Sequence, residues 1–459
     1  MFWPFGKKQK VKSELFSSNE RKKKTPVMEP LKAGRLVSLS LDKLVKIMNK
    51  SGPRPAGSDA SREACRMLLE MFKPYSDDAL ITSFQSSERS YYGTFKLIAI
   101  SVLPILLFMW IGLPLFSLLI FLFVAFSFYK EFFLCKSSKH YPSPLVDMCN
   151  VHAVIESEEE ATSTFIYTAH HDSASMFTVE KDDKKGLLLS LYLPLALYLL
   201  LGLFSVVMLL FDIFTLNFFH FNLPPLFPAI ILILLTFSSV CFIKLFKLVG
   251  KKYSPGAGDN LISSCMLTEL AHYFCWKKEN GEGLRNTRLI FASFDGEECG
   301  LKGSSAWFSE HKDLCTNAKV FNLDCPYYLE HLTFLTKDVN GFVPLSKTFA
   351  SSCAEDARSM GYRAEVGELP IFSGATDAAS AARTGLDSTT LMAIPMSGSA
   401  FAPYHSEKDV PDALDKATLE AVMAIAIKVV EKHYQSEEKK EESVPALSDE
   451  SRKFSLVRN

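Results

Sequence analysis

The sequence predicts an α/β fold in which a β-sheet is sandwiched between helices and two helical hairpins of transmembrane character are inserted. Two observations predict this fold. The hydrophilic parts of the 459-residue chain alternate between short segments rich in β-branched and aromatic residues and longer segments with helical periodicity. Such alternation is typical of a sheet covered by helices. The intervening apolar blocks lack the polar face that a long helix of a soluble protein carries.

The expected strands and helices follow one another through three hydrophilic segments. Strands are expected at 151–156, 164–169, 288–294, 320–323 and 390–394, and helices at 261–276, 303–310 and 413–434. In the first of these helices, Leu267, Leu270 and Ala271 share one face, as expected of a helix that packs on a sheet.

The composition excludes some classes of protein. Basic and acidic side chains number 50 and 51, and a net charge of -1 disfavours a nucleic-acid partner. Apolar residues make up 48% and charged residues 22%, which indicates a soluble domain with added membrane segments. The ten cysteines include no Cys-x-x-Cys pair, and such scattered thiols are typical of core residues in a reducing compartment.

Three apolar blocks are long enough to cross a bilayer. Residues 97–128 contain no Lys, Arg, Asp or Glu, and a spanning helix needs ~20 residues. Because Pro104, Gly112 and Pro114 interrupt this block, it forms either one long tilted helix or a hairpin of two short helices. The blocks at 186–211 and 213–243 indicate a second hairpin, with its turn near 212–225.

Acidic residues and histidines occur where the expected strands end, and at the start of one helix. Ligands of an open α/β sheet gather at the carboxyl ends of its strands. Histidine and carboxylate side chains suit zinc, and five ligands are enough for two metals that share one carboxylate. Taken singly, such residues are more often surface glutamates or helix caps. The residues are His170, Asp172, Asp259, Glu297, Glu298, Asp324 and His405.

Six short motifs occur together and in one order. They are Gly-Pro-Arg-Pro-Ala-Gly-Ser at 52–58, Ala-His-His-Asp-Ser at 169–173, Gly-Ala-Gly-Asp-Asn at 256–260, Phe-Asp-Gly-Glu-Glu-Cys-Gly-Leu-Lys-Gly-Ser at 294–304, Asn-Leu-Asp at 322–324 and Tyr-His-Ser at 404–406. The pattern closely resembles the co-catalytic zinc aminopeptidase family of metallopeptidase clan MH. Its members include bacterial leucyl aminopeptidases, glutamate carboxypeptidase-like enzymes and glutaminyl cyclases. The resemblance implies a mixed β-sheet between helices, the zinc aminopeptidase-like sandwich.

The resemblance also implies a set of ligands for two Zn²⁺ ions. His170 and Asp324 would bind one zinc, and Glu298 and His405 the other. Asp259 would bridge the two ions.

Two further carboxylates take catalytic roles by the same resemblance. Glu297 would be the general base for the water between the metals. Asp172 would hydrogen-bond the other ring nitrogen of His170 and so orient the imidazole, as carboxylates next to metal ligands do.

The chain departs from the family pattern at three places. The family often has Ser-Asp-His before the last strand, whereas residues 375–378 are Ala-Thr-Asp-Ala, so Asp377 matches and the histidine is absent. This departure leaves the substrate preference open. Cys325 and Pro326 follow Asp324 where a smaller linker is common. His171 is an extra histidine, and we expect it to point away from the metals because neighbours on a strand face opposite sides.

Both apolar insertions must return to one folded domain, so each crosses the membrane an even number of times. This requirement favours the hairpin for the first block and gives four spans in total. Each half of the first block has about 16 residues and reaches only ~24 Å as a helix, so this hairpin is either short or only partly inserted in the membrane. The expected domains are a basic disordered arm at 1–30, a catalytic domain at 31–94, 130–185 and 250–435, transmembrane hairpins at 95–129 and 186–249, and a disordered charged tail at 436–459.

Together these features predict a membrane-anchored metal-dependent exopeptidase, in the first place an aminopeptidase. The alternatives are a glutaminyl-cyclase-like or carboxypeptidase activity on the same fold, or a non-catalytic binding scaffold. A transporter is disfavoured because the spans carry almost no charged side chain. The expected partners are a peptide substrate and the lipid bilayer. The sequence does not determine the oligomeric state.

The distribution of lysines predicts the orientation. Lys96, Lys130, Lys185 and Lys244 flank the hairpins, whereas the two turns contain no Lys or Arg. Because basic residues remain inside, we expect a multi-pass protein of the cell membrane whose catalytic domain faces the cytoplasm.

Reporter fusions test this topology. Labels at Ser13, Asp183 and Ser451 should all report the cytoplasmic side, because each hairpin returns the chain to its starting side. A label on the opposite side at any one of the three positions contradicts the even number of crossings.

Overall fold

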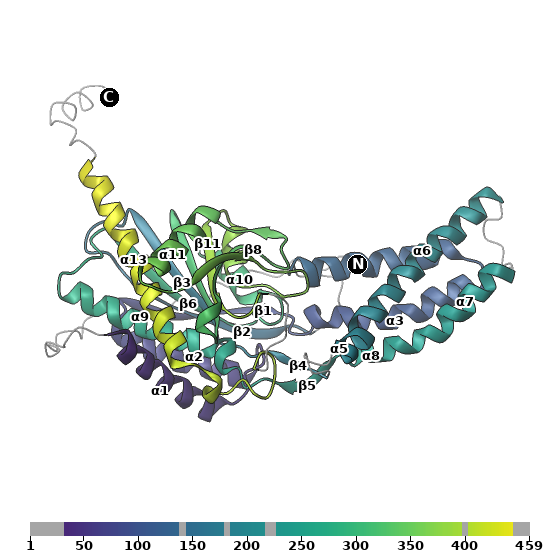
Figure 1. Cartoon of the computed structure of the whole chain (residues 1–459), viewed down its shortest axis with the longest axis horizontal. Coiled ribbons are helices and arrows are strands. Elements are labelled where there is room, and N and C mark those ends of the chain that lie inside the picture. Colours follow the sequence, from purple (N-terminus) through teal and green to yellow (C-terminus); the bar gives the residue numbers. More distant parts are fainter. Residues whose placement is uncertain (1–31, 137–143, 179–183, 216–225, 397–402, 444–459) are drawn as a thin grey trace, which may run out of the picture.

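The computed structural model describes residues 32–136, 144–178, 184–215, 226–396 and 403–443. Within them, a mixed β-sheet lies among helices, and four apolar helices extend from one side of this sheet domain as an elongated bundle (Figure 1). The predicted α/β architecture is thus confirmed.

The main sheet has nine strands in the described part of the chain, in the order β1-β2-β6-β3-β7-β11-β8-β10, with β9 paired to β8. Strands β6, β3, β7 and β11 are parallel to one another, and β10 is parallel to β8, whereas β1–β2, β2–β6 and β8–β11 pair antiparallel. The strands are β1 (Asp78–Ser86), β2 (Val146–Ile155), β3 (Ser163–His170), β6 (Thr287–Phe294), β7 (Ala318–Pro326), β8 (Leu332–Asp338), β9 (Val343–Pro344), β10 (Ala364–Glu368) and β11 (Asp387–Ala393).

Helices cover both faces of this sheet. Side chains of one group of helices share a core with Phe165, Tyr167 and Phe291 of the sheet; these helices are α1 (Ala33–Ser51), α2 (Asp59–Phe72), α9 (Ile262–Glu279), α11 (Lys347–Ser359) and α13 (Lys416–Ser443). The opposite face packs against α10 (Lys302–Glu310) and α12 (Ala378–Ala382), where Trp307 is fully buried. Strand β3 is buried along its whole length, as a central parallel strand covered on both faces must be.

The first apolar block forms two helices instead of one. Helix α3 (Ser90–Trp110) and helix α4 (Pro114–Phe128) are separated by a short turn in which Gly112 has φ +75°. This conformation suits glycine, and Pro114 occupies the first turn of α4, where its missing N–H is not needed. A π-helical turn (Tyr129–Phe133) extends α4.

The second apolar block also folds into helices. A π-helical turn (Leu188–Tyr192) and α6 (Leu193–Phe214) form its first half, and α7 (Leu226–Ser238), a 3₁₀ turn (Ser239–Cys241) and α8 (Phe242–Phe246) form its second. Helix α6 includes Asp212, so the turn begins later than predicted, and most of the predicted turn lies outside the described residues. By length and composition, the spans Ser90–Trp110, Pro114–Phe133, Leu188–Phe214 and Leu226–Phe246 could each cross a membrane.

The apolar helices are joined to the sheet domain through packing, an ion pair and a small second sheet. The buried Lys302 ammonium lies 3.4 Å from the buried Glu131 carboxylate, which links α10 to the end of the first hairpin. A two-stranded antiparallel sheet of β4 (Ser175–Phe177) and β5 (Val249–Tyr253) brings together the two ends of the second insertion. A four-residue helix, α5 (Lys184–Leu187), leads into that insertion.

All predicted strands and helices are found, with most ends shifted by a few residues. Helix α13 ends at Ser443, so its last residues occupy part of the segment expected to be a disordered tail. The basic arm at 1–30 and residues 444–459 lie outside the described residues. All ten cysteines are free thiols, and eight of them are buried, as expected of core residues.

Candidate metal centre

The polar side chains predicted from the sequence meet at one edge of the main sheet. His170 ends β3, Asp324 lies near the end of β7, and Glu297 and Glu298 follow β6. These three parallel strands are neighbours in the sheet, so their carboxyl ends lie together. Two loops complete the group. Asp259 lies in an irregular π-helical turn (Ala257–Leu261) before α9, and His405 lies in a loop before a 3₁₀ turn (Pro411–Ala413) and α13.

One half of the group surrounds His170. Its Nε2 lies 3.4 Å from Asp259 Oδ1, and 3.8 Å from both Asp324 Oδ1 and Glu297 Oε2. The ligand atoms of His170, Asp259 and Asp324 all lie within 4.8 Å of one another.

The other half surrounds His405. Its Nε2 lies 3.1 Å from Asp259 Oδ2 and 3.3 Å from Glu298 Oε2. The two carboxylate oxygens of Asp259 therefore face different histidines, so that this residue belongs to both halves of the group. This arrangement agrees with the bridging role that the family resemblance implies for Asp259.

Asp172 supports this group through the backbone. Its two carboxylate oxygens accept hydrogen bonds of 3.2 Å from the amides of Glu297 and Glu298. These two hydrogen bonds hold the tight turn that carries Glu297 and Glu298. The sequence did not indicate this role of Asp172. The predicted contact with His170 is longer: Nδ1 lies 3.3 Å from Asp172 Oδ1, without the alignment of a hydrogen bond.

Burial and crowding of like charges shift the pKa values in this group. Burial raises the pKa of Glu297 well above its ordinary value, and the neighbouring Glu298 carboxylate raises it further. Burial also raises the pKa of Asp324. Burial alone would lower the pKa of His170, but Glu297, Asp172 and Asp259 outweigh it and raise that pKa. Burial opposes ionisation of Asp259 too, yet contacts with His170 and His405 lower its pKa.

The residues fit a divalent cation. Five carboxylates and two histidines share a buried space, and a buried negative charge is unfavourable without a positive partner. Among the described residues, Glu298 Oε1 and Asp324 Oδ1 are buried and accept no hydrogen bond. Mixed nitrogen and oxygen ligands are typical of zinc sites with catalytic roles. The group can therefore hold metal.

Arg54 holds the loops that carry these residues. Its guanidinium is fully buried and donates to four backbone carbonyls, at His171 (2.8 Å), Gly52 (2.8 Å), Pro255 (3.0 Å) and Gly256 (2.6 Å). Burial lowers the pKa of Arg54 to about 10, so it stays charged at neutral pH. Arg54 belongs to the motif at 52–58, but the sequence did not predict that its side chain would act as a clamp, which here means that it holds several loops together.

Asp409 supports the loop from its other side. Its carboxylate accepts hydrogen bonds from the amides of Gly258 (2.7 Å) and Asp259 (3.2 Å). Burial raises the pKa of Asp409 to about 7. No motif in the sequence pointed to this residue, because it holds the loop through backbone amides. In addition, Asn260 Nδ2 donates to Leu323 O at 2.8 Å, which ties the loop to β7.

A cavity of about 300 Å³ opens onto the group. His170, Asp259, Glu297, Glu298, Asp324 and His405 lie on one of its sides. Its remaining wall is largely apolar, and part of this wall belongs to the apolar helices, whose contributing residues are Tyr91, Tyr92, Phe95, Phe132, Leu191 and Tyr192. The cavity therefore lies between the metal centre and the helical bundle.

The residues at the three places where the chain departs from the family pattern, including the matching Asp377, lie in different surroundings. Asp377 is buried, and burial raises its pKa to about 7. Cys325 lines the cavity and has φ +48°, a left-handed conformation that re-aims the chain after Asp324. His171 turns away from the centre toward Ser293, 2.9 Å from its Nδ1.

Replacing Arg54 with lysine should loosen the centre. Lysine has one compact ammonium and cannot reach four carbonyls in different directions, and each buried carbonyl left without a donor costs about 1–3 kcal/mol. We expect Arg54→Lys to lower the unfolding midpoint and the metal content per chain, measured by calorimetry and elemental analysis. The exposed Arg66, paired with Glu63, offers the control Arg66→Lys. Equal behaviour of the two variants would contradict the clamp.

Comparison with known proteins agrees with this description. Residues 246–430 match the family model of peptidase family M28. That segment contributes Asp259, Glu297, Glu298, Asp324 and His405, whereas His170 and Asp172 precede it. No curated protein sequence matches the chain.

Solved structures share the fold at low sequence identity. The chain is similar to a zinc aminopeptidase from Bacillus subtilis, with 12% identity, a TM-score of 0.50, and coverage of 88% of this chain and 95% of that one. An aminopeptidase from Aneurinibacillus sp. strain AM-1 gives 13% identity, a TM-score of 0.50, and coverage of 87% and 95%. A glutaminyl cyclase from Porphyromonas gingivalis gives 14% identity, a TM-score of 0.49, and coverage of 86% and 98%. Residues 246–430 are thus similar to peptidase family M28, and the mixed sheet among helices has the fold of a zinc aminopeptidase.

Proposed function

We propose that this protein is a membrane-anchored, zinc-dependent aminopeptidase that removes residues from the N-termini of peptides. The observation that carries the proposal is the buried group at the carboxyl ends of β3, β6 and β7, in which Asp259 belongs to two sets of ligand atoms. The match to peptidase family M28 supports a metal-dependent peptidase.

Two Zn²⁺ ions are the cofactors in this proposal. His170 and Asp324 would hold one ion, Glu298 and His405 the other, with Asp259 between them. Bound zinc lowers the pKa of a water molecule and polarises the scissile carbonyl.

Glu297 would act as the general base. It is 8% exposed and lines the cavity, so its carboxylate can reach a substrate there while staying shielded from bulk water. It would take a proton from the attacking water and deliver it to the leaving amine. The raised pKa of Glu297 suits both steps, since a carboxylate that binds protons more readily is a better base. Asp172 would position this residue through the amide of Glu297.

The charges of the cavity favour an N-terminal substrate over a C-terminal one. Among the described residues, the lining includes no Lys or Arg that could pair with the terminal carboxylate of a peptide. A substrate carboxylate would instead meet the acidic group. The positive α-amino group of a peptide finds opposite charges there. This contrast argues against the carboxypeptidase alternative.

The helical bundle supports a membrane anchor. Many large apolar side chains of these helices are exposed, among them Leu103 (70%), Leu199 (65%), Phe214 (84%) and Phe237 (76%). Contact with lipid removes such surface from water. The excess of lysine at the hydrophilic ends supports a cytoplasmic catalytic domain.

The same helices line the cavity, so a peptide that is already at the membrane would meet the site at a raised effective concentration. The alternative is that the helices only anchor the enzyme.

Hydrolysis assays on two glutamate variants test the chemistry. Glu297→Gln should keep its metal while hydrolysis of aminoacyl reporters falls about 10²–10⁴-fold, because the water loses its proton acceptor. Glu298→Ala should instead lower the metal content. The reading combines reporter turnover with elemental analysis of each purified variant.

The control for these variants is Glu365→Gln, on the exposed side of β10, which should leave both properties unchanged. Unchanged turnover in Glu297→Gln removes that residue from the mechanism. Release of ammonia from N-terminal glutamine peptides, without cleavage of any aminoacyl reporter, replaces the aminopeptidase by a glutaminyl cyclase.

The apolar wall should determine which peptides are cleaved. Tyr192 is 44% exposed and lines the cavity, so Tyr192→Ala should lower kcat/KM for reporters with N-terminal Phe about tenfold more than for those with Gly. The reporters are supplied in soluble and acylated form to protein in lipid vesicles, and we expect the acylated form to be preferred. Tyr129→Ala, equally exposed but outside the lining, is the control. If the protein cleaves the soluble and the acylated reporters equally well, the helices serve only as anchors.

A further inference from the structure

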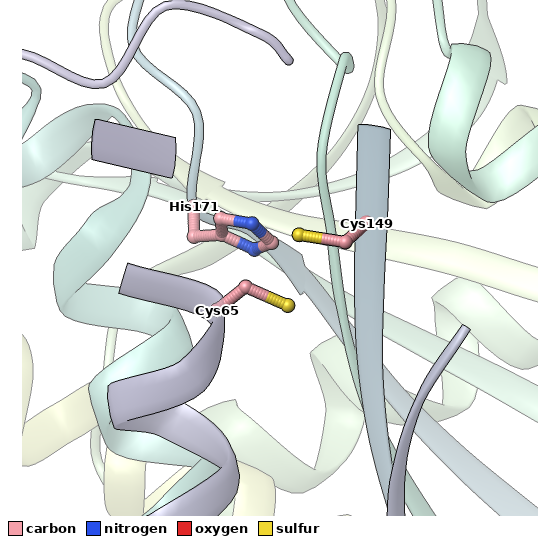
Figure 2. A group of neighbouring side chains, drawn as sticks. All are labelled: Cys65, Cys149 and His171. Carbon is pink, nitrogen blue, oxygen red and sulfur yellow. The ribbon is translucent and has the colours of Figure 1, made fainter. Parts of the chain in front are cut away.

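A second group of potential metal ligands includes His171, the histidine that points away from the first group. Figure 2 shows Cys65, Cys149 and His171 with their side chains directed toward one another. They come from α2, β2 and the residue after β3. The two sulfur atoms and one imidazole nitrogen lie within 4.8 Å of one another, and all three residues are buried.

Hydrogen bonds of two serine hydroxyl groups determine which ring nitrogen of His171 carries the lone pair. Ser264 Oγ donates its only proton to the carbonyl of His170 (2.8 Å). Its contact with Ser293 Oγ, at 2.7 Å, must therefore use the proton of Ser293. Ser293 Oγ then has no proton left for His171 Nδ1 at 2.9 Å, so Nδ1–H is the donor.

In neutral His171, Nε2 is consequently the nitrogen with the free electron pair. This atom is buried and makes no hydrogen bond with the described residues. An imidazole that is held through one nitrogen and keeps the lone pair of the other for a metal is the arrangement that metal-binding histidines adopt.

We propose that Cys65, Cys149 and His171 form a structural site for Zn²⁺, separate from the metal centre beside the cavity. Zinc binds thiolate sulfur at about 2.3 Å and imidazole nitrogen at about 2.0–2.1 Å, so ligand atoms that already lie within 4.8 Å need only a small contraction. Three protein ligands leave one tetrahedral position for a water molecule. A disulfide between the cysteines would use both sulfurs but leave His171 Nε2 buried without a partner.

The site would stabilise the segment of the chain that carries the proposed catalytic residues. It would join α2 and β2 to the segment of His170, His171 and Asp172. The same segment is held by Arg54, which donates to the carbonyl of His171, and Cys149 N donates to the buried Asp295 at 3.3 Å. Zinc at this place would cross-link three parts of the chain that are distant in sequence.

Cobalt substitution distinguishes the two metal sites. The metal centre offers carboxylates and imidazoles, so only the thiol site gives a thiolate-to-cobalt charge-transfer band in the near ultraviolet. We expect the full-length protein loaded with Co²⁺ to show this band, and Cys65→Ser and Cys149→Ser each to remove it. The double variant should bind one metal ion fewer per chain than the unaltered protein.

Two controls identify the source of the band. Cys325→Ser removes the thiol next to the metal centre, and Cys353→Ser removes an unrelated buried thiol of the core; both should keep the band. X-ray absorption on the unaltered zinc protein provides a reading that does not depend on the folding of a variant, and it should show sulfur ligands. Absence of sulfur ligands and of the band overturns the proposal. So does loss of the band in Cys325→Ser alone, or a Cys65–Cys149 disulfide in the purified protein.

Discussion

The buried guanidinium of Arg54 is the interaction on which the arrangement of the candidate metal centre depends. The whole second helical hairpin separates His170 and Asp172 from Asp259 in the chain, yet the three residues lie together in the structure. Arg54 donates to His171 O before the insertion and to Pro255 O and Gly256 O after it. One side chain thus binds both margins of the interruption. Because its partners are carbonyls of the main chain, the clamp does not depend on which side chains the two segments carry.

The negative charge of the site adds a second constraint. Carboxylates packed together in a buried space repel one another. A bound metal ion can offset this repulsion only if the side chains are already positioned to bind it. The protein positions them through backbone contacts: Asp172 holds the turn of Glu297 and Glu298, and Asp409 holds the loop of Asp259. Acidic residues thus serve both as candidate ligands and as the supports that orient them.

The sequence predicted the strands well, and it predicted that the polar residues at their ends lie together, because polar residues at the ends of apolar strands stand out. His170 after 164–169 and Asp324 after 320–323 are examples. It could not predict the roles of Arg54 and Asp409, because both hold the loops through backbone groups, which have no sequence signature. Nor could it predict that Tyr91 and Phe132 of the apolar helices line the cavity, since this follows from how the bundle docks on the sheet. The cluster of Cys65, Cys149 and His171 was equally hidden, because its members are spread over three elements.

The position of β3 in the sheet has a consequence for biosynthesis. Its two neighbours, β6 and β7, both follow the second hairpin in the chain, so β3 leaves the ribosome well before either partner exists. The helices of the second hairpin are translated in this interval, and those of the first hairpin precede β3. The central strands can therefore pair only after both hairpins have been made. The candidate metal centre, which needs the ends of β3, β6 and β7, is among the last parts of the molecule to assemble, and a nascent chain has no complete centre while its apolar segments are being synthesised.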